Sequence, residues 1–388
     1  MKKLLLLALL CLLPLAAHAE PARDVTGQAL LAIDGKDTTG ATLRDRDWET
    51  GVALPGDIDQ YIWVTPGEDA ISCVYVQYGP EVSSLAVEIW REDRWRTAAS
   101  IRNTGGLAEM ALRFAPQKET FRLHFVPVEP GHRSYIRELY LFSPGDTDFD
   151  YVHAWRLPSD QADILFISTH PDDELLWFGG AIPSCANAGR DVQVVCLACD
   201  NIIRRQELIS GLWHCGVRRY PEIGMLVDMR ADRQKALWYW GGEEAVLDHF
   251  VRMLRQYRPR VIVTHGEDGE SGHIQHRLCA EFVQRALPLA AQADYKPELG
   301  AAWQAQKLYL HGGAAPTLRM DWDLPLNNLG GKTGMEIARE AFKCHASQNH
   351  VRYWVQDRGD PNDSTVYTLA YSAVGADMAC DDFFENLP

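Results

Sequence analysis

The sequence predicts two domains: an antiparallel β-sandwich followed by an α/β domain with a mostly parallel sheet. Up to Phe142, short alternating apolar runs recur between turn signals, whereas from Ile164 onward apolar strands alternate with helical patterns. The chain has 388 residues, which is more than one typical domain requires. Histidines and acids also follow two of the later strands, at the edge where α/β sheets keep their binding sites. We therefore expect a sandwich over residues 20–150 and a domain carrying the chemistry over residues 151–388.

Residues 1–19 have the pattern of a cleaved signal peptide. Lys2 and Lys3 precede a leucine-rich run, and Ala17-His18-Ala19 fits a cleavage site. A membrane anchor is the alternative, but an apolar core of about 15 residues is short for a bilayer. No later segment approaches the roughly 18 apolar residues of a membrane span. We therefore expect an exported protein, periplasmic or secreted, without a transmembrane segment after cleavage.

The charge balance excludes some classes of partner. The formal net charge is −15, and a protein that binds phosphate needs clustered lysine and arginine. Nucleic acid and anionic membrane surfaces are therefore not expected as partners. Eight cysteines follow the signal segment, several of them inside apolar runs, so we expect at most one or two disulfides. Cys196 and Cys199 form a C-x-x-C, but no second such pair is present to suggest a zinc cluster.

The β-rich part is predicted from its alternating runs, which are Tyr61 to Val64, Cys73 to Tyr78, Leu85 to Ile89, Phe121 to Phe125 and Tyr135 to Phe142. Trp90 to Trp95 is typical of a hairpin with a charged tip. This layout resembles the discoidin-like, galactose-binding-like jelly rolls. The resemblance implies a candidate carbohydrate-binding module, but a spacer or stabilising domain fits it equally, because fold does not determine function.

Ser143 to Asp150 is rich in turn formers and is the expected linker. The strands expected after it are Ile164 to Ser168, Val192 to Leu197, Arg260 to Thr264 and Lys307 to His311, with a further one at Ile223 to Val227. The helices expected between and after them are Gly180 to Ala188, Ile202 to Cys215, Ala245 to Tyr257, His276 to Ala286, and one opened by the capping box Thr333 to Glu336 and reaching Ala346.

Two strand ends carry the candidate chemistry. The first strand runs into His170-Pro171-Asp172-Asp173-Glu174, and the strand that ends at Thr264 is followed by a glycine-rich loop with His273 and His276. Residues three apart at a helix start share a face, so both histidines can point the same way. Because the carboxyl ends of parallel strands meet at one edge of the sheet, we expect the two clusters to converge.

The residue types suit a catalytic zinc site, which takes three nitrogen or oxygen ligands and leaves a position open. His170, Asp173 and His276 would supply the ligands. Asp172 would then be free to act as general base, and His273 could stabilise an oxyanion or protonate a leaving amine. Glu174 is expected to be structural. His265, His311 and His345 are left without a role.

The combined pattern resembles the LmbE-like (PIG-L) family of zinc-dependent N-deacetylases. The matching positions are His170 to Glu174, the glycine, glutamate and histidines of Gly269 to His276, Gly179-Gly180, Arg204 to Leu208, and Ser347-Gln348. The resemblance implies a Rossmann-like sheet with helices on both faces. It also implies the same ligands, base and second catalytic histidine as above, with Arg204 as a substrate contact.

The sequence departs from that family at two positions. Gln275 stands where an aspartate is usual, and we expect this to change the tuning of His273. Thr169 replaces a common alanine and is expected to be harmless.

The function expected from these observations is that of an exported zinc-dependent de-N-acetylase, acting on an N-acetylated amino sugar of the N-acetylglucosamine type within a glycan or glycoconjugate. Two alternatives stay open: hydrolysis of another N-acyl or carbamoyl amide, and a glycan-binding envelope protein with a degenerate metal site.

Overall fold

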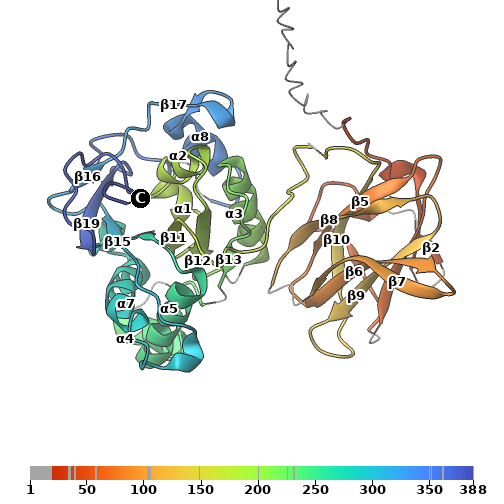
Figure 1. Cartoon of the computed structure of the whole chain (residues 1–388), viewed down its shortest axis with the longest axis horizontal. Helices are drawn as coiled ribbons and strands as arrows, with labels where there is room; N and C mark the ends of the chain where they lie inside the picture. The colour runs from red at the N-terminus through yellow and green to blue at the C-terminus, as the bar shows by residue number, and fades with distance from the viewer. Residues whose placement is uncertain are drawn as a thin grey trace, which may run out of the picture. The chain divides into compact units, whose positions relative to one another are not determined.

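The computed structural model describes residues 20–33, 36–38, 41–56, 59–102, 106–147, 149–199, 201–224, 226–229, 232–348, 350, 352–360 and 362–387. The chain divides into two compact units, Met1–His153 and Ala154–Pro388, each described here by itself (Figure 1). The expected signal peptide, residues 1–19, lies outside the described residues.

The first unit contains two antiparallel sheets, as expected. One has the strand order β2-β1-β4-β9-β6-β7 and the other β3-β10-β5-β8. Their bounds are β1 Leu30–Ile33, β2 Lys36–Thr38, β3 Val52–Ala53, β4 Gln60–Thr65, β5 Ile71–Tyr78, β6 Val82–Arg91, β7 Arg94–Arg102, β8 Glu109–Gln117, β9 Phe121–Pro127 and β10 Tyr135–Phe142. Short 3-10 turns occur at Thr26–Gln28 and Ala41–Leu43.

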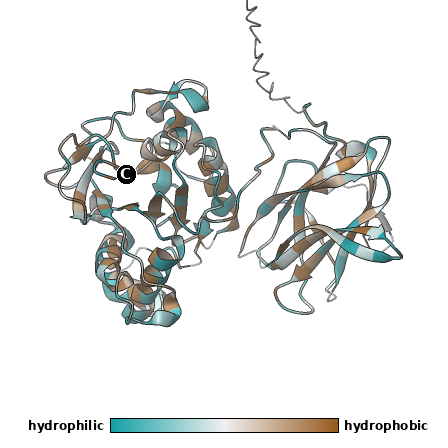
Figure 2. Ribbon diagram, in the orientation of Figure 1, coloured by the Kyte–Doolittle hydropathy of each residue, from teal (hydrophilic) through white to brown (hydrophobic). Residues whose placement is uncertain are grey.

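Alternation along each strand decides which face is buried. In β9, Phe121, Leu123 and Phe125 are fully buried, while Arg122 and His124 between them face outward. Apolar and polar residues accordingly alternate along the strands of this unit (Figure 2).

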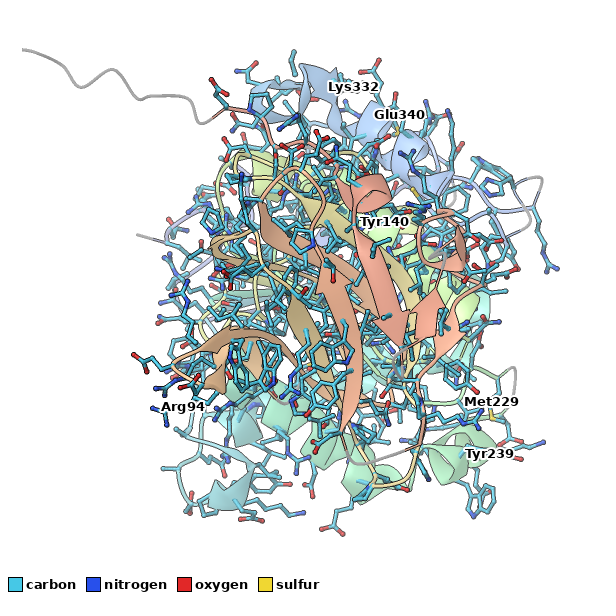
Figure 3. The ribbon with its side chains drawn as sticks, turned by 90° about the vertical axis from the view of Figure 1, so that its right-hand side faces the viewer. Arg94, Tyr140, Met229, Tyr239, Lys332 and Glu340 are labelled. Atoms are coloured by element: carbon cyan, nitrogen blue, oxygen red, sulfur yellow. The ribbon has the colours of Figure 1, made fainter. Side chains whose placement is uncertain are left out.

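The hairpin expected at Trp90 to Trp95 joins β6 to β7, and these two tryptophans pair across the strands. Its turn residues, Glu92 and Asp93, have φ values of 52° and 55°, the left-handed conformation that a tight two-residue hairpin requires. Figure 3 shows Arg94 projecting at the hairpin tip.

The second unit is α/β with a mostly parallel sheet of order β13-β12-β11-β14-β15-β19-β16, which confirms that expectation. The first five strands in this order are parallel, and β19 runs antiparallel to both of its neighbours. Their bounds are β11 Ile164–Ser168, β12 Val192–Cys196, β13 Glu222–Ile223, β14 Val261–Thr264, β15 Lys307–His311, β16 Leu318–Arg319 and β19 Val366–Ser372; β17 Pro325–Leu326 and β18 Lys332–Thr333 form a separate pair.

Helices flank this sheet (Figure 1). Helices α4, α5 and α7 pack on one face, where Val246, Phe250 and Phe282 join Leu165 and Ile262 of the sheet in one core. The bounds are α1 Asp173–Leu176, α2 Ala181–Asn187, α3 Ile202–His214, α4 Arg233–Tyr239, α5 Glu243–Tyr257, α6 Gly269–Gly272, α7 Ile274–Ala290 and α8 Gly334–Phe342, with 3-10 turns at Pro297–Leu299 and Asn327–Leu329.

Several elements differ from the expectation. Strand β19 and helix α4 were not expected, and the glycine-rich loop contains the short helix α6. The capping box at Thr333 and Glu336 is present, but α8 ends at Phe342 instead of Ala346. The further strand expected up to Val227 is shorter, because β13 ends at Ile223; Met225 lies outside the described residues.

The eight cysteines after the signal segment are all free thiols. Among the helices that the structure describes, none combines the length and apolar character that crossing a bilayer would need.

Candidate metal centre

The first motif leaves strand β11 through a strained turn. Asp172 has φ 111°, a left-handed value that is uncommon for a residue with a side chain. Its carbonyl accepts the N–H groups of Leu175 and Leu176 at 3.0 and 2.9 Å, so Asp172 caps helix α1. The turn gives Asp172 and Asp173 different surroundings although they are adjacent in the chain.

The three predicted ligands come together. The nitrogen Nδ1 of His170, the oxygen Oδ2 of Asp173 and the nitrogen Nε2 of His276 are each 3.1 Å from the other two. Tetrahedral ligands at about 2.0–2.1 Å from zinc lie about 3.3–3.4 Å from each other, so this triangle has nearly the size that zinc requires. The residues present therefore fit the metal that the sequence predicts.

Each ligand is held by a contact on the side that faces away from the triangle. The Nε2 atom of His170 is 2.8 Å from Oε1 of Gln275, and Nδ1 of His276 is 2.8 Å from Oε2 of Glu270. The indole N–H of Trp177 donates to Oδ1 of Asp173 at 3.0 Å. Such partners fix the orientation of each ligand, so that its free lone pair points at the metal position.

Glu270 is the centre of a second group that the sequence did not assign. Its carboxylate lies 3.0 Å from Nδ1 of His265 and 3.1 Å from Nδ1 of His311, in addition to its contact with His276. The Nε2 atom of His265 accepts the backbone N–H of Thr169 at 3.0 Å. His265 follows β14 directly and His311 ends β15, so histidines at adjacent strand ends were the signal available in the sequence.

The charges of the site also fit a cation. Burial alone would raise the pKa of Asp173, but the imidazoles of His276 and His170 outweigh it and hold that pKa well below its usual range. Burial alone would lower the pKa of His276, yet Asp173 raises it to about 10. A field that stabilises a proton on His276 this strongly would also stabilise a divalent cation between the ligands.

Asp172 is not part of the ligand triangle. Burial, followed by the adjacent Asp173, raises the pKa of Asp172 to about 7. Its Oδ1 is 3.3 Å from a guanidinium nitrogen of Arg204, and the amide nitrogen of Gln348 can be oriented toward Oδ2 at 3.1 Å. The two adjacent acids therefore differ: Asp173 is held in the charged form that a cation needs, whereas Asp172 can take up a proton near neutral pH.

His273 is the N-cap residue of α7 and lies beside two of the ligands. Its ring centroid is 4.7 Å from that of His170 and 4.5 Å from that of His276. Burial, followed by these two imidazoles, lowers the pKa of His273 to about 4. Within the described parts of the chain, its Nδ1 atom has no hydrogen-bond partner, although it is buried. Such an unpaired buried nitrogen is uncommon in folded proteins.

The side chain of Gln275 contacts Nε2 of His170, accepts the backbone N–H of Met229 at 3.2 Å and donates to the carbonyl of Val227 at 2.8 Å. Its expected effect on the tuning of His273 stays a prediction. Arg204 was expected to contact substrate. In the structure it pairs with Asp172 and, at 2.9 Å, with Asp228.

Two other groups of candidate metal ligands also contain His276. His170, His273 and His276 form one group with ligand atoms within 4.8 Å of one another, and Asp173, His265 and His276 form another. Glu270 and His311 are among the residues that line a cavity of about 920 Å³. Neither Asp172 nor the predicted ligands line it. It is therefore not the space where Asp172 would meet a substrate.

Part of the second unit is similar in sequence to proteins of known activity. Residues 165–287 match the model of the family described as GlcNAc-PI de-N-acetylase, PIG-L. The 1D-myo-inositol 2-acetamido-2-deoxy-alpha-D-glucopyranoside deacetylase of a Nocardioides species is 30% identical over 211 residues, which cover 45% of this chain and 69% of that protein.

Two further likenesses are partial. The corresponding deacetylase 1 of Catenulispora acidiphila is 30% identical over 182 residues, 39% of this chain; the match spans only 56% of that relative's length. The solved N,N'-diacetylchitobiose deacetylase of Pyrococcus horikoshii is 18% identical, with 48% of this chain and 71% of that chain covered and a TM-score of 0.38.

Proposed function

This chain belongs to the PIG-L family, and from that membership we propose that it is a zinc-dependent N-deacetylase acting on an N-acetylated amino sugar. The observation that carries the proposal is the triangle of His170, Asp173 and His276, whose 3.1 Å sides suit zinc. When bound there, zinc would supply Lewis acidity that polarises a carbonyl and makes water more acidic.

The neighbouring residues supply the proton transfers. Asp172 accepts a proton from the water whose oxygen attacks the acetamide carbon, because its carboxylate lies beside the ligands without being one of them. The C–N bond then breaks, and the amine nitrogen takes up a proton as acetate leaves. We assign to His273, whose ring packs beside those of His170 and His276, a hydrogen bond to the developing oxyanion, and to Asp172 the return of its proton to the amine.

The substrate class is proposed from the relatives. The names of the Nocardioides and Catenulispora relatives both specify a 2-acetamido-2-deoxy glucopyranoside. We extend this to an acetamido sugar within a glycan or glycoconjugate and to an exported protein; the pattern of residues 1–19 supports export. A Rossmann-like arrangement is likewise part of the proposal, supported by the order of β13, β12, β11, β14 and β15.

The first unit is proposed to be a jelly-roll-like domain that contacts glycan. Its six-stranded sheet has an outward aromatic face, where the guanidinium of Arg122 lies 4.0 Å from the ring centre of Tyr61 and 4.4 Å from that of Trp95. Trp63 and Trp95 pack edge to face at 5.3 Å. Aromatic rings beside planar polar groups suit the apolar faces and hydroxyls of sugar rings. Loss of glycan retention by Trp95→Ala, with deacetylation of a short soluble substrate unchanged, would support this role.

The test of the activity is acetate release by the full chain supplied with zinc. The panel contains N-acetylglucosamine oligomers, an N-acetylglucosaminyl inositol, and sugars bearing larger N-acyl or carbamoyl groups. We expect release from at least one N-acetylated sugar and a much slower release by the Asp172→Asn variant. Release only from the other amides would move the chain to a different amidohydrolase activity. No release from any of them would contradict the proposal.

A further inference from the structure

Glu174, in the first turn of helix α1, forms a buried ion pair that does not involve the metal ligands. Glu174 and His345 are both fully buried, and Oε1 of Glu174 lies 2.7 Å from Nε2 of His345. The two residues are 171 positions apart in the chain. A buried pair of this kind is weak evidence for stability, since desolvation of both charges opposes it, and an alternative role is to impose one specific arrangement.

The second carboxylate oxygen of Glu174 contacts the backbone of Asp172. Oε2 accepts the backbone N–H of Asp172 at 2.8 Å. That residue has φ 111°, and a side-chain-bearing residue keeps such a conformation only where its surroundings enforce it. We propose that Glu174 and His345 are positioning residues, which hold Asp172 in the backbone conformation that aims its carboxylate as the base. This inference rests on the proposed function, in which Asp172 is that base.

The segment that carries His345 reaches Asp172 from a second side. His345 follows helix α8, and its backbone N–H donates to the carbonyl of Phe342 at 3.1 Å. Three residues later, the amide nitrogen of Gln348 can face Oδ2 of Asp172 at 3.1 Å. One short segment therefore supports both the backbone and the carboxylate of Asp172.

The same segment is itself anchored to helix α3. Both the backbone N–H and the hydroxyl of Ser347 donate to the carboxylate of Glu207 at 2.6 Å. Glu207 also lies 4.0 Å from Nδ1 of His345. Ser347 therefore anchors the segment that carries His345 to helix α3.

The contacts of this pair are separate from those that orient the metal ligands. Asp173, His170 and His276 take their outer contacts from Trp177, Gln275 and Glu270. Loss of the pair should therefore change the rate of the chemical step more than metal binding. Small displacements of a catalytic group lower rates by as much as about a hundredfold.

The experiment uses His345→Leu and His345→Gln in the full chain loaded with zinc. We expect His345→Leu to lower kcat about 10–100-fold, with KM and zinc content unchanged. His345→Gln should recover part of the rate, because its amide N–H can still donate to Glu174. The matched control is His153→Leu, which removes a buried histidine lying 2.6 Å from Glu109 in the first unit; it should alter stability without changing kcat.

A double-mutant cycle separates positioning from general damage. If His345 acts through Asp172, His345→Leu should have little further effect in an Asp172→Asn background. An equal fold-loss in both backgrounds, or a loss of zinc with His345→Leu, would overturn the proposal. Should His345→Leu fail to fold, Glu174→Gln, which keeps the shape of the side chain, replaces it in the cycle.

A crystal structure of the same variant gives a readout that needs no activity. Asp172 should leave its left-handed conformation when the pair is broken. If Asp172 keeps φ near 111° in the variant, the inference fails even when the wild type is an active deacetylase. If the wild type releases no acetate but Asp172 shifts, the proposed function fails and the structural relationship stands.

Discussion

Glu174 and Glu270 are both buried carboxylates, one in each motif, yet they support different parts of the site. Glu174 contacts one backbone N–H, that of Asp172, and one imidazole, that of His345. Glu270 contacts three imidazoles, those of His265, His276 and His311. The comparison teaches that Glu174 supports the base, whereas Glu270 supports a ligand and the histidines packed around it. Substitutions of the two glutamates should therefore fail in different ways.

The largest effect is expected for Asp172→Asn, which removes the proposed base of the first motif and leaves the adjacent ligand Asp173 unchanged. The amide keeps the size of the side chain but cannot take a proton from water, so kcat should fall about 10²–10⁴-fold. Zinc content should stay at the wild-type level, because Asp172 is outside the ligand triangle. Steady-state kinetics and metal analysis on one preparation check both; loss of zinc would place Asp172 among the ligands.

Glu270→Gln should weaken zinc binding about 10–100-fold, because the ligand His276 loses the carboxylate that orients it. Burial alone would raise the pKa of Glu270, but the contact with His265 outweighs it and holds that pKa well below its usual range, so the native group is a carboxylate. Competition with a chromophoric chelator measures the affinity. The matched variant Glu174→Gln should keep the wild-type zinc affinity. Equal losses of zinc affinity in both variants would remove the distinction between the two glutamates.

Trp177→Phe should have a smaller effect on the same affinity. It removes one N–H donor to Oδ1 of Asp173 and keeps an aromatic ring beside His276. The loss of a single hydrogen bond to a charged oxygen corresponds to a decrease of about tenfold. An unchanged affinity, measured by the same chelator competition, would show that the helix alone fixes Asp173.

The smallest effect is expected for Gln275→Leu. Oδ1 of Asp228 lies 3.3 Å from the same His170 nitrogen and can replace the lost acceptor, so the loss in affinity should stay below about tenfold. Adding Asp228→Asn should enlarge that loss, since His170 then has neither acceptor. If the double variant binds zinc as tightly as the single one, His170 is oriented by other contacts.

The parts that local patterns encode were predictable from the sequence. Strand β11 has the predicted bounds Ile164–Ser168, and the ligands His170, Asp173 and His276 meet as the two strand ends required. Side-chain directions after the second strand were harder to predict: Gln275 contacts His170 and not His273. The direction of the Gln275 side chain depends on how the preceding loop orients the start of helix α7, which residue spacing does not define.

The supporting residues could not be predicted, because they depend on long-range packing. His345 reaches Glu174 from beyond α8, and no local pattern reports that meeting. Trp177, the C-cap residue of α1, follows Asp173 by four residues, and this spacing was visible in the sequence. The sequence contained one further indication of these supporting contacts: three histidines without an assigned role, His265, His311 and His345.

Metal content tests the central claim most directly. Protein purified without chelators should contain about one zinc per chain, and the Asp173→Asn variant should lose most of it, because Asp173 contributes an oxygen to the triangle. Inductively coupled plasma mass spectrometry on both proteins, prepared side by side, gives the answer. A wild-type content below about 0.2 equivalents would contradict the account, as would equal zinc in the two proteins.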